Sequence, residues 1–244
     1  MDDCIIYVAT HKKIKRPKRL SNIYKYIVCG ASIGNLGDSD YFYDDFEDNI
    51  SKMNLYYSEL TGLYWIWKHS SSDIIGLAHY RRFLLSPHHF RPLNKFDIEK
   101  ILRNNDIILP KKIVLKRGVK NELFRFVKTE YFKIIEEKVI EYDSSYKEYF
   151  EDFFSGNSMY ICNMFIAKRE LINSYFEWLF SILFLIGEEI VFDESNKRVM
   201  GYISEWLFNI WINKNVLKTY ECKMLFVKND KSIKDTIVKL ILGD

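Results

Sequence analysis

The stretch that decides the fold is Asp73-Ile74-Ile75-Gly76-Leu77-Ala78-His79-Tyr80-Arg81-Arg82. After its first residue it is apolar, which is typical of a short buried strand. The chain then leaves this strand through four polar or aromatic side chains. A similar transition occurs near the start, where residues 4–9 form an apolar run that ends in Thr10-His11-Lys12. Because ligands of open α/β sheets bind beyond the carboxyl ends of the strands, we expect both polar segments to face one crevice.

The rest of the chain alternates between strand-like and helix-like segments. Apolar runs predict strands at residues 23–29, 106–110, 158–167 and 220–227. Helical spacing predicts helices at residues 51–68, 94–103, 168–185 and 199–213, with a mainly helical stretch at 121–154. This alternation predicts an α/β fold with a mostly parallel central sheet flanked by helices. No linker-like stretch interrupts it, so we expect a single domain over residues 1–244.

Composition excludes several classes of protein. Hydrophobic residues make up 48% and charged residues 28%, which is ordinary for a globular chain. The net charge of +3 is too small for a typical nucleic-acid binder, so we expect no nucleic-acid partner. The four cysteines show no CxxC spacing, which disfavours a disulfide framework or zinc site and favours the reducing cytoplasm. Aromatic residues reach 16%, and they could line a sugar site or fill the core.

The sequence does not predict a membrane-spanning segment. Its acidic start differs from the basic start of a signal peptide. The longest apolar stretch, residues 178–187, is too short to cross a bilayer. Two segments are compatible with peripheral contact with the inner membrane: the basic residues 11–19 and an amphipathic stretch at 232–242. The basic run equally fits a solvated loop or a contact with a diphosphate.

The segment His79-Tyr80-Arg81-Arg82 is the sharpest chemical signal. Arginine binds phosphate oxygens in a bidentate manner and stays charged at any physiological pH. Two guanidiniums at a strand end therefore favour an anionic ligand, whereas the alternative is a structural ion pair with a carboxylate.

Acidic residues in the preceding loop offer a weaker signal. Residues 44–49 could coordinate a metal or hold ribose hydroxyls, or they could form a solvated turn with a helix cap. Asp38-Ser39-Asp40 spells the DxD pattern with which many sugar transferases hold Mn²⁺ or Mg²⁺ on a diphosphate. It lies in a glycine-containing loop rather than after an apolar strand, so a chance match is the simpler interpretation.

Glu205 lies in an otherwise apolar helical segment. A carboxylate is costly to bury there unless it is paired or functional. Arg198, two helical turns earlier, could be its partner or could bind phosphate. The pair His88-His89 has no third ligand nearby, which argues against a metal site. The chain contains no GxSxG, GxGxxG, P-loop or HExxH pattern.

Several segments together resemble a known family, the bacterial capsular and exopolysaccharide glycosyltransferases filed as domain of unknown function number 4422. The resemblance runs in family order over nearly the whole chain. It is carried by residues 7–12, 48–51, 54, 58–68, 75–83, 106–110, 163–166, 198–199 and 201–205.

The resemblance implies a GT-A-like fold that binds a nucleotide sugar. It implies transfer of a sugar, such as galactofuranose or another hexose, from a UDP-sugar to a lipid-linked glycan in capsule, exopolysaccharide or O-antigen synthesis. We expect the catalytic base to be Glu205, with Glu59 as the second candidate. The residues expected to bind the donor are Thr10, His11, Lys12, Asp48, Asn49, His79, Tyr80, Arg81, Arg82, Asn163 and Arg198.

The need for a metal stays open at this stage. Residues 79–82 fall where a GT-A fold would carry its DxD, so arginines could replace or assist Mn²⁺ or Mg²⁺ on the donor diphosphate. No metal-ligating residue is therefore assigned.

The chain also departs from the family pattern. Phe46-Glu47 replaces the usual Thr-Gly, Ser58 replaces a Cys, and the helix around Tyr131 lacks the usual His. These departures keep an alternative open, namely a catalytically inactive glycan-binding or assembly protein with the same fold.

Overall fold

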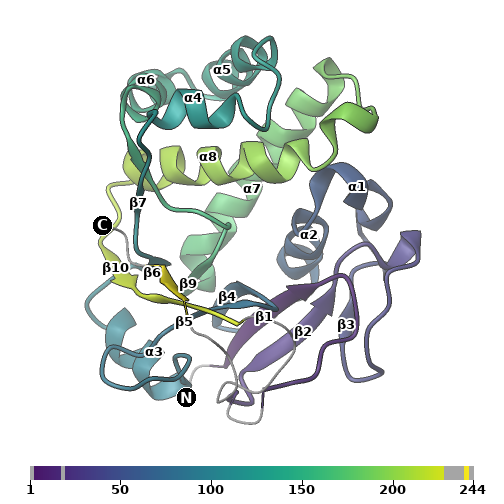
Figure 1. The fold of residues 1–244 in the computed structure, drawn as a ribbon, viewed down its shortest axis with the longest axis vertical. Coiled ribbons are helices and arrows are strands. Elements are labelled where there is room, and N and C mark those ends of the chain that lie inside the picture. The colour runs from purple at the N-terminus through teal and green to yellow at the C-terminus, as the bar shows by residue number, and fades with distance from the viewer. Residues whose placement is uncertain (1–2, 18–19, 228–238, 242–244) are drawn as a thin grey trace.

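The protein is built around a mixed β-sheet with helices on both faces (Figure 1). The computed structural model describes residues 3–17, 20–227 and 239–241. Seven strands lie side by side in the order β10 (Thr219–Cys222), β6 (Ile107–Pro110), β9 (Phe165–Lys168), β4 (Ile74–His79), β1 (Cys4–Thr10), β2 (Tyr24–Val28) and β3 (Phe42–Tyr43). All run in one direction except β9, which is antiparallel to both neighbours. The predicted α/β fold with a mostly parallel central sheet is confirmed.

A second set of strands leaves the sheet at the end of β4. Strand β5 (Arg82–Leu84) turns back antiparallel to β4, with His79 opposite Arg82. Strand β11 (Met224–Phe226) pairs with β5, and β12 (Lys239–Ile241) pairs with β11. These strands form one wall beyond the carboxyl end of β4. A separate short ladder joins β7 (Ile113–Val114) and β8 (Ser158–Met159).

The alternation of side chains in β1 explains why helices cover both faces of the sheet. Tyr7 and Ala9 contribute to one core, whereas Ile6 and Val8 contribute to the other. The first core packs under α2 (Leu60–His69), α7 (Arg169–Glu189) and α8 (Val199–Lys214). The second core packs against α3 (Lys95–Leu102) on the opposite face.

A layer of three shorter helices lies beyond α8: α4 (Val119–Leu123), α5 (Tyr131–Tyr142) and α6 (Lys147–Ser155) (Figure 1). Aromatic rings fill the space between these helices and α7 and α8, including Tyr146 stacked on Trp178. Tyr131, which the family pattern places in this region, is buried and bonds to the carbonyl of Val191. It is therefore a packing residue.

Three predicted elements are interrupted in the structure. The helix expected at 51–68 is a 3₁₀ turn (Ser51–Met53), α1 (Asn54–Tyr57) and α2, with a break at Ser58, whose φ is 51°. The strand expected at 158–167 is split into β8 and β9 by Cys162 and Asn163, both with positive φ. The strand expected at 220–227 is divided into β10 and β11.

Helix α7 extends beyond the apolar stretch recognised in the sequence. With 21 residues, it is long and apolar enough to cross a membrane by length and composition alone. Core helices of soluble proteins meet the same test, and Ile172, Phe176 and Leu179 of α7 are fully buried in the structure.

The two segments considered for membrane contact are only partly described. In the basic segment, Lys13 pairs with Asp38, and Arg16 donates to the carbonyls of Ser21 and Tyr24. These two cations therefore hold the loop. Most of residues 232–242 lies outside the described residues.

Candidate active site

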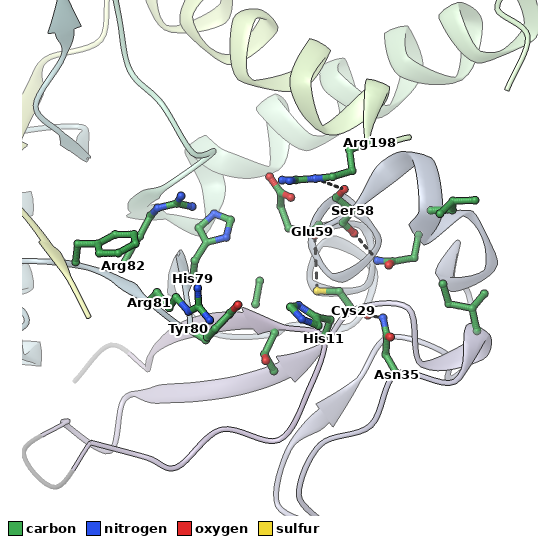
Figure 2. Close-up of a pocket in the computed structure, with 16 residues that line it drawn as sticks. His11, Cys29, Asn35, Ser58, Glu59, His79, Tyr80, Arg81, Arg82 and Arg198 are labelled. Carbon is green, nitrogen blue, oxygen red and sulfur yellow. Dashed lines mark hydrogen bonds between the residues drawn. The ribbon is translucent and has the colours of Figure 1, made fainter. Parts of the chain in front are cut away.

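A cavity of about 520 Å³ opens beyond the carboxyl ends of β1, β2 and β4 (Figure 2). The register of β1 with β4 pairs Ala9 with His79, which places the two polar segments side by side. The amide of Tyr80 donates to the carbonyl of Ala9 over 3.2 Å and extends this contact past the strand ends. The lining residues are Ala9, Thr10, His11, Cys29, Ile33, Asn35, Asn54, Leu55, Ser58, Glu59, His79, Tyr80, Arg81, Arg82, Arg198 and Phe226.

Three guanidiniums face this cavity without a carboxylate partner among the described residues. Arg81 lies over the ring of Tyr80 at 4.9 Å, and its buried Nε has no hydrogen-bond partner. Arg82 lies 5.7 Å from the centre of the Phe226 ring. Because buried or half-buried cations normally find an anion, the ion-pair alternative fails here and the cavity fits an anionic ligand.

Arg198 reaches the cavity from the start of α8. Its backbone has a φ of 66°, and its amide donates to the carbonyl of Leu55. Its Nε donates to Ser58 Oγ over 3.3 Å. The contact with Glu205 considered from the sequence is not an ion pair in the structure, because Arg198 is held by the α1 segment instead.

The loop after β1 adds an imidazole and a further cation. His11 meets Tyr80 edge to face, with ring centres 5.6 Å apart. Burial lowers the pKa of His11, and the nearby charges of Lys12, Arg81 and Arg198 lower it further, so the ring is neutral at pH 7. Thr10 accepts a bond from the amide of Lys12 and fixes this turn. Lys12 is not among the lining residues, although its Nζ lies 5.6 Å from the centre of the Tyr80 ring.

The end of the cavity beside Cys29 carries amide side chains and aliphatic side chains. Asn35 uses its Nδ2 to bond the carbonyl of Cys29, and Asn54 uses its Nδ2 to bond Ser58 and Thr61. Their Oδ1 atoms accept no hydrogen bond within the described residues. Gly30, with a φ of 78°, makes this approach possible, because a Cβ there would lie 2.5 Å from Asn54 Cγ.

Two carboxylates lie near the arginines. Glu59 lines the cavity, and its Oε1 accepts from Asn163 Nδ2 over 3.0 Å. Glu205 lies just behind, where its Oε2 accepts from the amide of Cys162 over 2.8 Å. Asn163 is buried, so it positions Glu59 and does not line the cavity itself.

The Cys162 peptide connects Glu205 with His79. Its amide donates to Glu205, and its carbonyl lies 2.6 Å from His79 Nε2. Since a carbonyl only accepts, Nε2 carries the proton and Nδ1 is left as an acceptor. Burial lowers the pKa of His79, with Arg82 and Arg198 acting in the same direction and Glu59 opposing, so the ring is neutral at pH 7.

Glu205 has the chemistry of a general base. Burial raises its pKa from 4.5 to about 7, and the charge of Glu59 acts in the same direction. The Cys162 amide and the guanidiniums of Arg82 and Arg198 oppose this shift. A carboxyl that titrates near pH 7 can take up a proton during a reaction and release it afterwards.

Asp48 and Asn49 do not line this cavity. The carboxylate of Asp48 accepts from Tyr64, and its backbone carbonyl lies 2.9 Å from His69 Nε2. Asn49 caps the following turn by accepting from the amide of Ser51. Asp48 is thus held by α2 and Asn49 by its own turn, so their expected role in donor binding is not supported by their position.

The acidic loop has a structural role at Asp44. This fully buried carboxylate accepts from the amides of Gly30 and Ala31 and from the hydroxyl of Ser51. Asp38 of the DxD-like pattern pairs with Lys13. Within the described ranges, no group of three or more His, Cys, Asp or Glu residues is placed to hold a metal ion. Among the lining residues, Glu59 is the one that carries a carboxylate.

A second cavity, of about 430 Å³, lies beside residues 85–90 and 220–223. It is lined by His88 and His89 together with Lys111 and Glu221, and it lies apart from the arginines.

Sequence reasoning missed eight lining residues: Ala9, Cys29, Ile33, Asn35, Asn54, Leu55, Ser58 and Phe226. Asn54 and Ser58 belong to segments that carry the family resemblance, which was the available signal. Asn35 and Phe226 reach the cavity through a loop and through the β5–β11 pairing, which no local pattern indicates.

Comparison with known proteins shows the family to which this chain belongs. The fold of this chain is similar to that of a solved glycosyltransferase. The chain belongs to the family described as Domain of unknown function (DUF4422), whose sequence profile matches residues 5–216. No curated protein sequence matches the chain.

A solved structure gives the same result at the level of the fold. The apo structure of the bifunctional glycosyltransferase WbbM is similar to this chain, with 27% sequence identity and a TM-score of 0.81. The match covers 99% of this chain and 48% of the WbbM chain, so this chain spans about half the length of that protein.

Proposed function

We propose that this protein is a glycosyltransferase that moves a hexose, such as galactofuranose, from a UDP-sugar to a glycan acceptor. The observation that carries the proposal is the set of three guanidiniums, from Arg81, Arg82 and Arg198, that face one cavity without carboxylate partners. Similarity to a bifunctional glycosyltransferase supports the same reaction class.

One side of the cavity is cationic and the opposite end is uncharged, and this difference matches the two parts of a nucleotide sugar. Figure 2 shows residues 79–82 at one side and Asn35 with Cys29 at the other, with Arg198 above Glu59 between them. The cationic side matches a diphosphate. The amide oxygens and the aliphatic side chains at the opposite end match a nucleoside, which offers N–H and hydroxyl donors together with an apolar base.

The proposed chemistry is a single displacement with inversion. Glu205 takes the proton of an acceptor hydroxyl, and that oxygen bonds to the anomeric carbon of the donor. The bond from this carbon to the diphosphate oxygen breaks at the same time. The nucleoside diphosphate leaves with the new negative charge next to Arg81, Arg82 and Arg198, which stabilise it. Glu59, which is fixed by Asn163, is the second candidate for the base.

The acceptor that we propose is a lipid-linked saccharide in capsule, exopolysaccharide or O-antigen assembly, at the cytoplasmic face of the inner membrane. This part of the proposal rests on the family resemblance. Because Arg81, Arg82 and Arg198 already supply positive charge at the cavity, we propose that nucleotide binding does not need Mn²⁺ or Mg²⁺.

Nucleotide binding tests the proposal directly. Thermal shifts of the purified protein would be measured with UDP, GDP, CMP and dTDP, each with Mn²⁺ and with EDTA. A ligand that binds the native state raises the midpoint by mass action. We expect UDP to raise it equally under both conditions.

Variants connect this shift to the arginines. Removing a charge-assisted hydrogen bond costs about 1.5–3 kcal/mol, so we expect Arg82→Ala to weaken UDP binding by about 10- to 100-fold. Arg103→Ala, on an exposed arginine at the end of α3, is the matched control and should bind normally. No shift of the wild type with any nucleotide, together with no slow hydrolysis of a UDP-sugar, would instead support an inactive glycan-binding protein.

A further inference from the structure

Helix α8 carries a second functional residue on the face that holds Glu205. Tyr202 and Glu205 are three residues apart, so they share one face and lie about 4.5 Å apart along the helix axis. On its other side, the ring of Tyr202 lies 5.2 Å from the guanidinium carbon of Arg198. Tyr202 thus lies between a guanidinium at the cavity and the proposed base. Its hydroxyl makes no hydrogen bond within the described residues.

Phe126 stacks on Tyr202 from the loop after α4. The ring centres are 4.6 Å apart and the planes are inclined by 26°. The loop is well anchored, because Leu123 and Val127 are buried and the amide of Phe126 donates to the carbonyl of Leu123. Phe126 nevertheless remains 39% exposed. One face of its ring lies against Tyr202, and the guanidinium carbon of Arg125 lies 5.5 Å from the ring centre, so the exposed area is the part of the ring that these two contacts leave uncovered.

The chemistry of this pair fits a neutral sugar. A saccharide ring has faces of C–H bonds, which pack against an aromatic face, and edges of hydroxyl groups, which need hydrogen-bond partners. The free hydroxyl of Tyr202 supplies such a partner. The negative face of an aromatic ring disfavours a phosphate, and the nearby Arg125 is already paired with Glu122.

We propose that the exposed part of the Phe126 ring and the hydroxyl of Tyr202 form the subsite for a neutral saccharide ring of the acceptor. The sugar held there lies about one helical turn from Glu205 and next to Arg198, which lines the cavity. This proposal rests on the proposed glycosyltransferase function and adds the position of its second substrate.

The test uses the full chain with saturating UDP and five simple sugars as probes. These are the methyl glycosides of galactose, glucose, mannose, rhamnose and N-acetylglucosamine. Saturation-transfer NMR would report which sugar protons contact the protein, and a titration would give the affinity. We expect at least one probe to bind the wild type through the C–H protons of one ring face.

Three variants then separate the subsite from the fold. Phe126→Ala should weaken that probe by about tenfold, which corresponds to the usual contribution of an aromatic contact. Tyr202→Phe should weaken it less, because it keeps the stacked ring and removes the hydroxyl. Phe96→Ala is the matched control, since Phe96 is 68% exposed on α3 at the opposite face of the sheet. The shift induced by UDP should be unchanged in all three.

The outcomes distinguish this proposal from the proposed function. If UDP binds normally but Phe126→Ala binds the probe as tightly as the wild type does, the proposed acceptor subsite is wrong. The proposed glycosyltransferase function is unaffected by that result. The same conclusion holds if none of the five sugars contacts the UDP-bound wild type. If UDP itself produces no shift in the wild type, the proposed function fails, and the acceptor subsite fails with it.

Discussion

Glu205 shows how one residue can connect stability with catalysis. Its pKa of about 7 in the folded protein lies above its ordinary value of 4.5, so the folded state binds the proton more tightly than the unfolded state. The contribution of this group to stability is therefore greatest below about pH 4.5 and is lost as the pH rises through 7. The carboxylate form, which the proposed base requires, is the form that destabilises the fold.

Replacing Glu205 by Gln should therefore raise thermal stability and remove activity. Gln keeps the acceptor for the Cys162 amide but does not titrate. We expect a higher melting temperature than the wild type at about pH 8, little difference at about pH 5, and a large loss of turnover with normal UDP binding. Wild-type turnover should rise between about pH 6 and pH 8.

Glu59→Gln is the comparison that assigns the base. If it abolishes turnover while Glu205→Gln remains active, the roles of the two carboxylates are reversed. An equal melting temperature of Glu205→Gln and the wild type at about pH 8 would contradict the raised pKa.

At the residue scale, the sequence indicated the chemistry of single side chains but not their neighbours. Glu205 was recognisable because a carboxylate stands out in an apolar helix. Its bond to the Cys162 amide depends on a turn with positive φ at two residues that are not glycine, and such a turn has no sequence signal. Asp48 was placed at the donor by resemblance, whereas its carboxylate bonds to Tyr64.

Among the elements, the turn after β2 shapes the end of the cavity at which we propose that the nucleoside binds. The buried carboxylate of Asp44 accepts from the amides of Gly30 and Ala31, and so connects the strand end to the 3₁₀ turn at Ser51–Met53. Asp44→Ala would leave these amides without an acceptor. We expect a loss of about 2–4 kcal/mol in the free energy of unfolding and a smaller shift with UDP.

Asp45→Ala is the control for this prediction, because the neighbouring Asp45 is exposed. Its cost should stay within about 0.5 kcal/mol in denaturant melts. Equal costs for the two variants would show that the Asp44 contacts do not hold the turn.

The boundaries of helices and strands were predictable where one pattern of hydrophobic spacing continues along the sequence. They were not predictable where tertiary contacts interrupt the element. The strands around residues 4–9 and 74–79 and the helix at 199–213 follow the expected pattern closely. The stretch 51–68 has helical spacing throughout, yet Ser58 breaks it so that Asn54 and Glu59 both reach the cavity. The break at Ser58 serves the arrangement of the cavity, so the helix propensity of the local sequence does not predict it.

For the whole molecule, the net charge is only +3, yet one cavity is lined by three guanidiniums that have no carboxylate partner within the described part of the chain. We expect the affinity for UDP to fall as NaCl rises through about 0.05–0.5 M, because exposed charges are screened over about 10 Å at 0.1 M salt.

Uridine should show almost no dependence on salt in the same titrations, since it lacks the diphosphate. Equal slopes for UDP and uridine would place the diphosphate away from the arginines.

The α/β class was predictable at this scale because strands and helices alternate along the chain. The reversed direction of β9 was not, because an antiparallel strand has the same composition as a parallel one.

That reversed strand has a consequence for the order in which the chain can fold. Strand β9 is the contact between β4 on one side and β6 on the other, and it begins only at Phe165. During synthesis, β1, β2 and β4 can pair early, but the edge of β4 remains open until the chain has been made as far as β9. An open apolar edge is a template for pairing with other chains. The newly made protein therefore carries its main risk of aggregation in the interval before β9 closes the sheet.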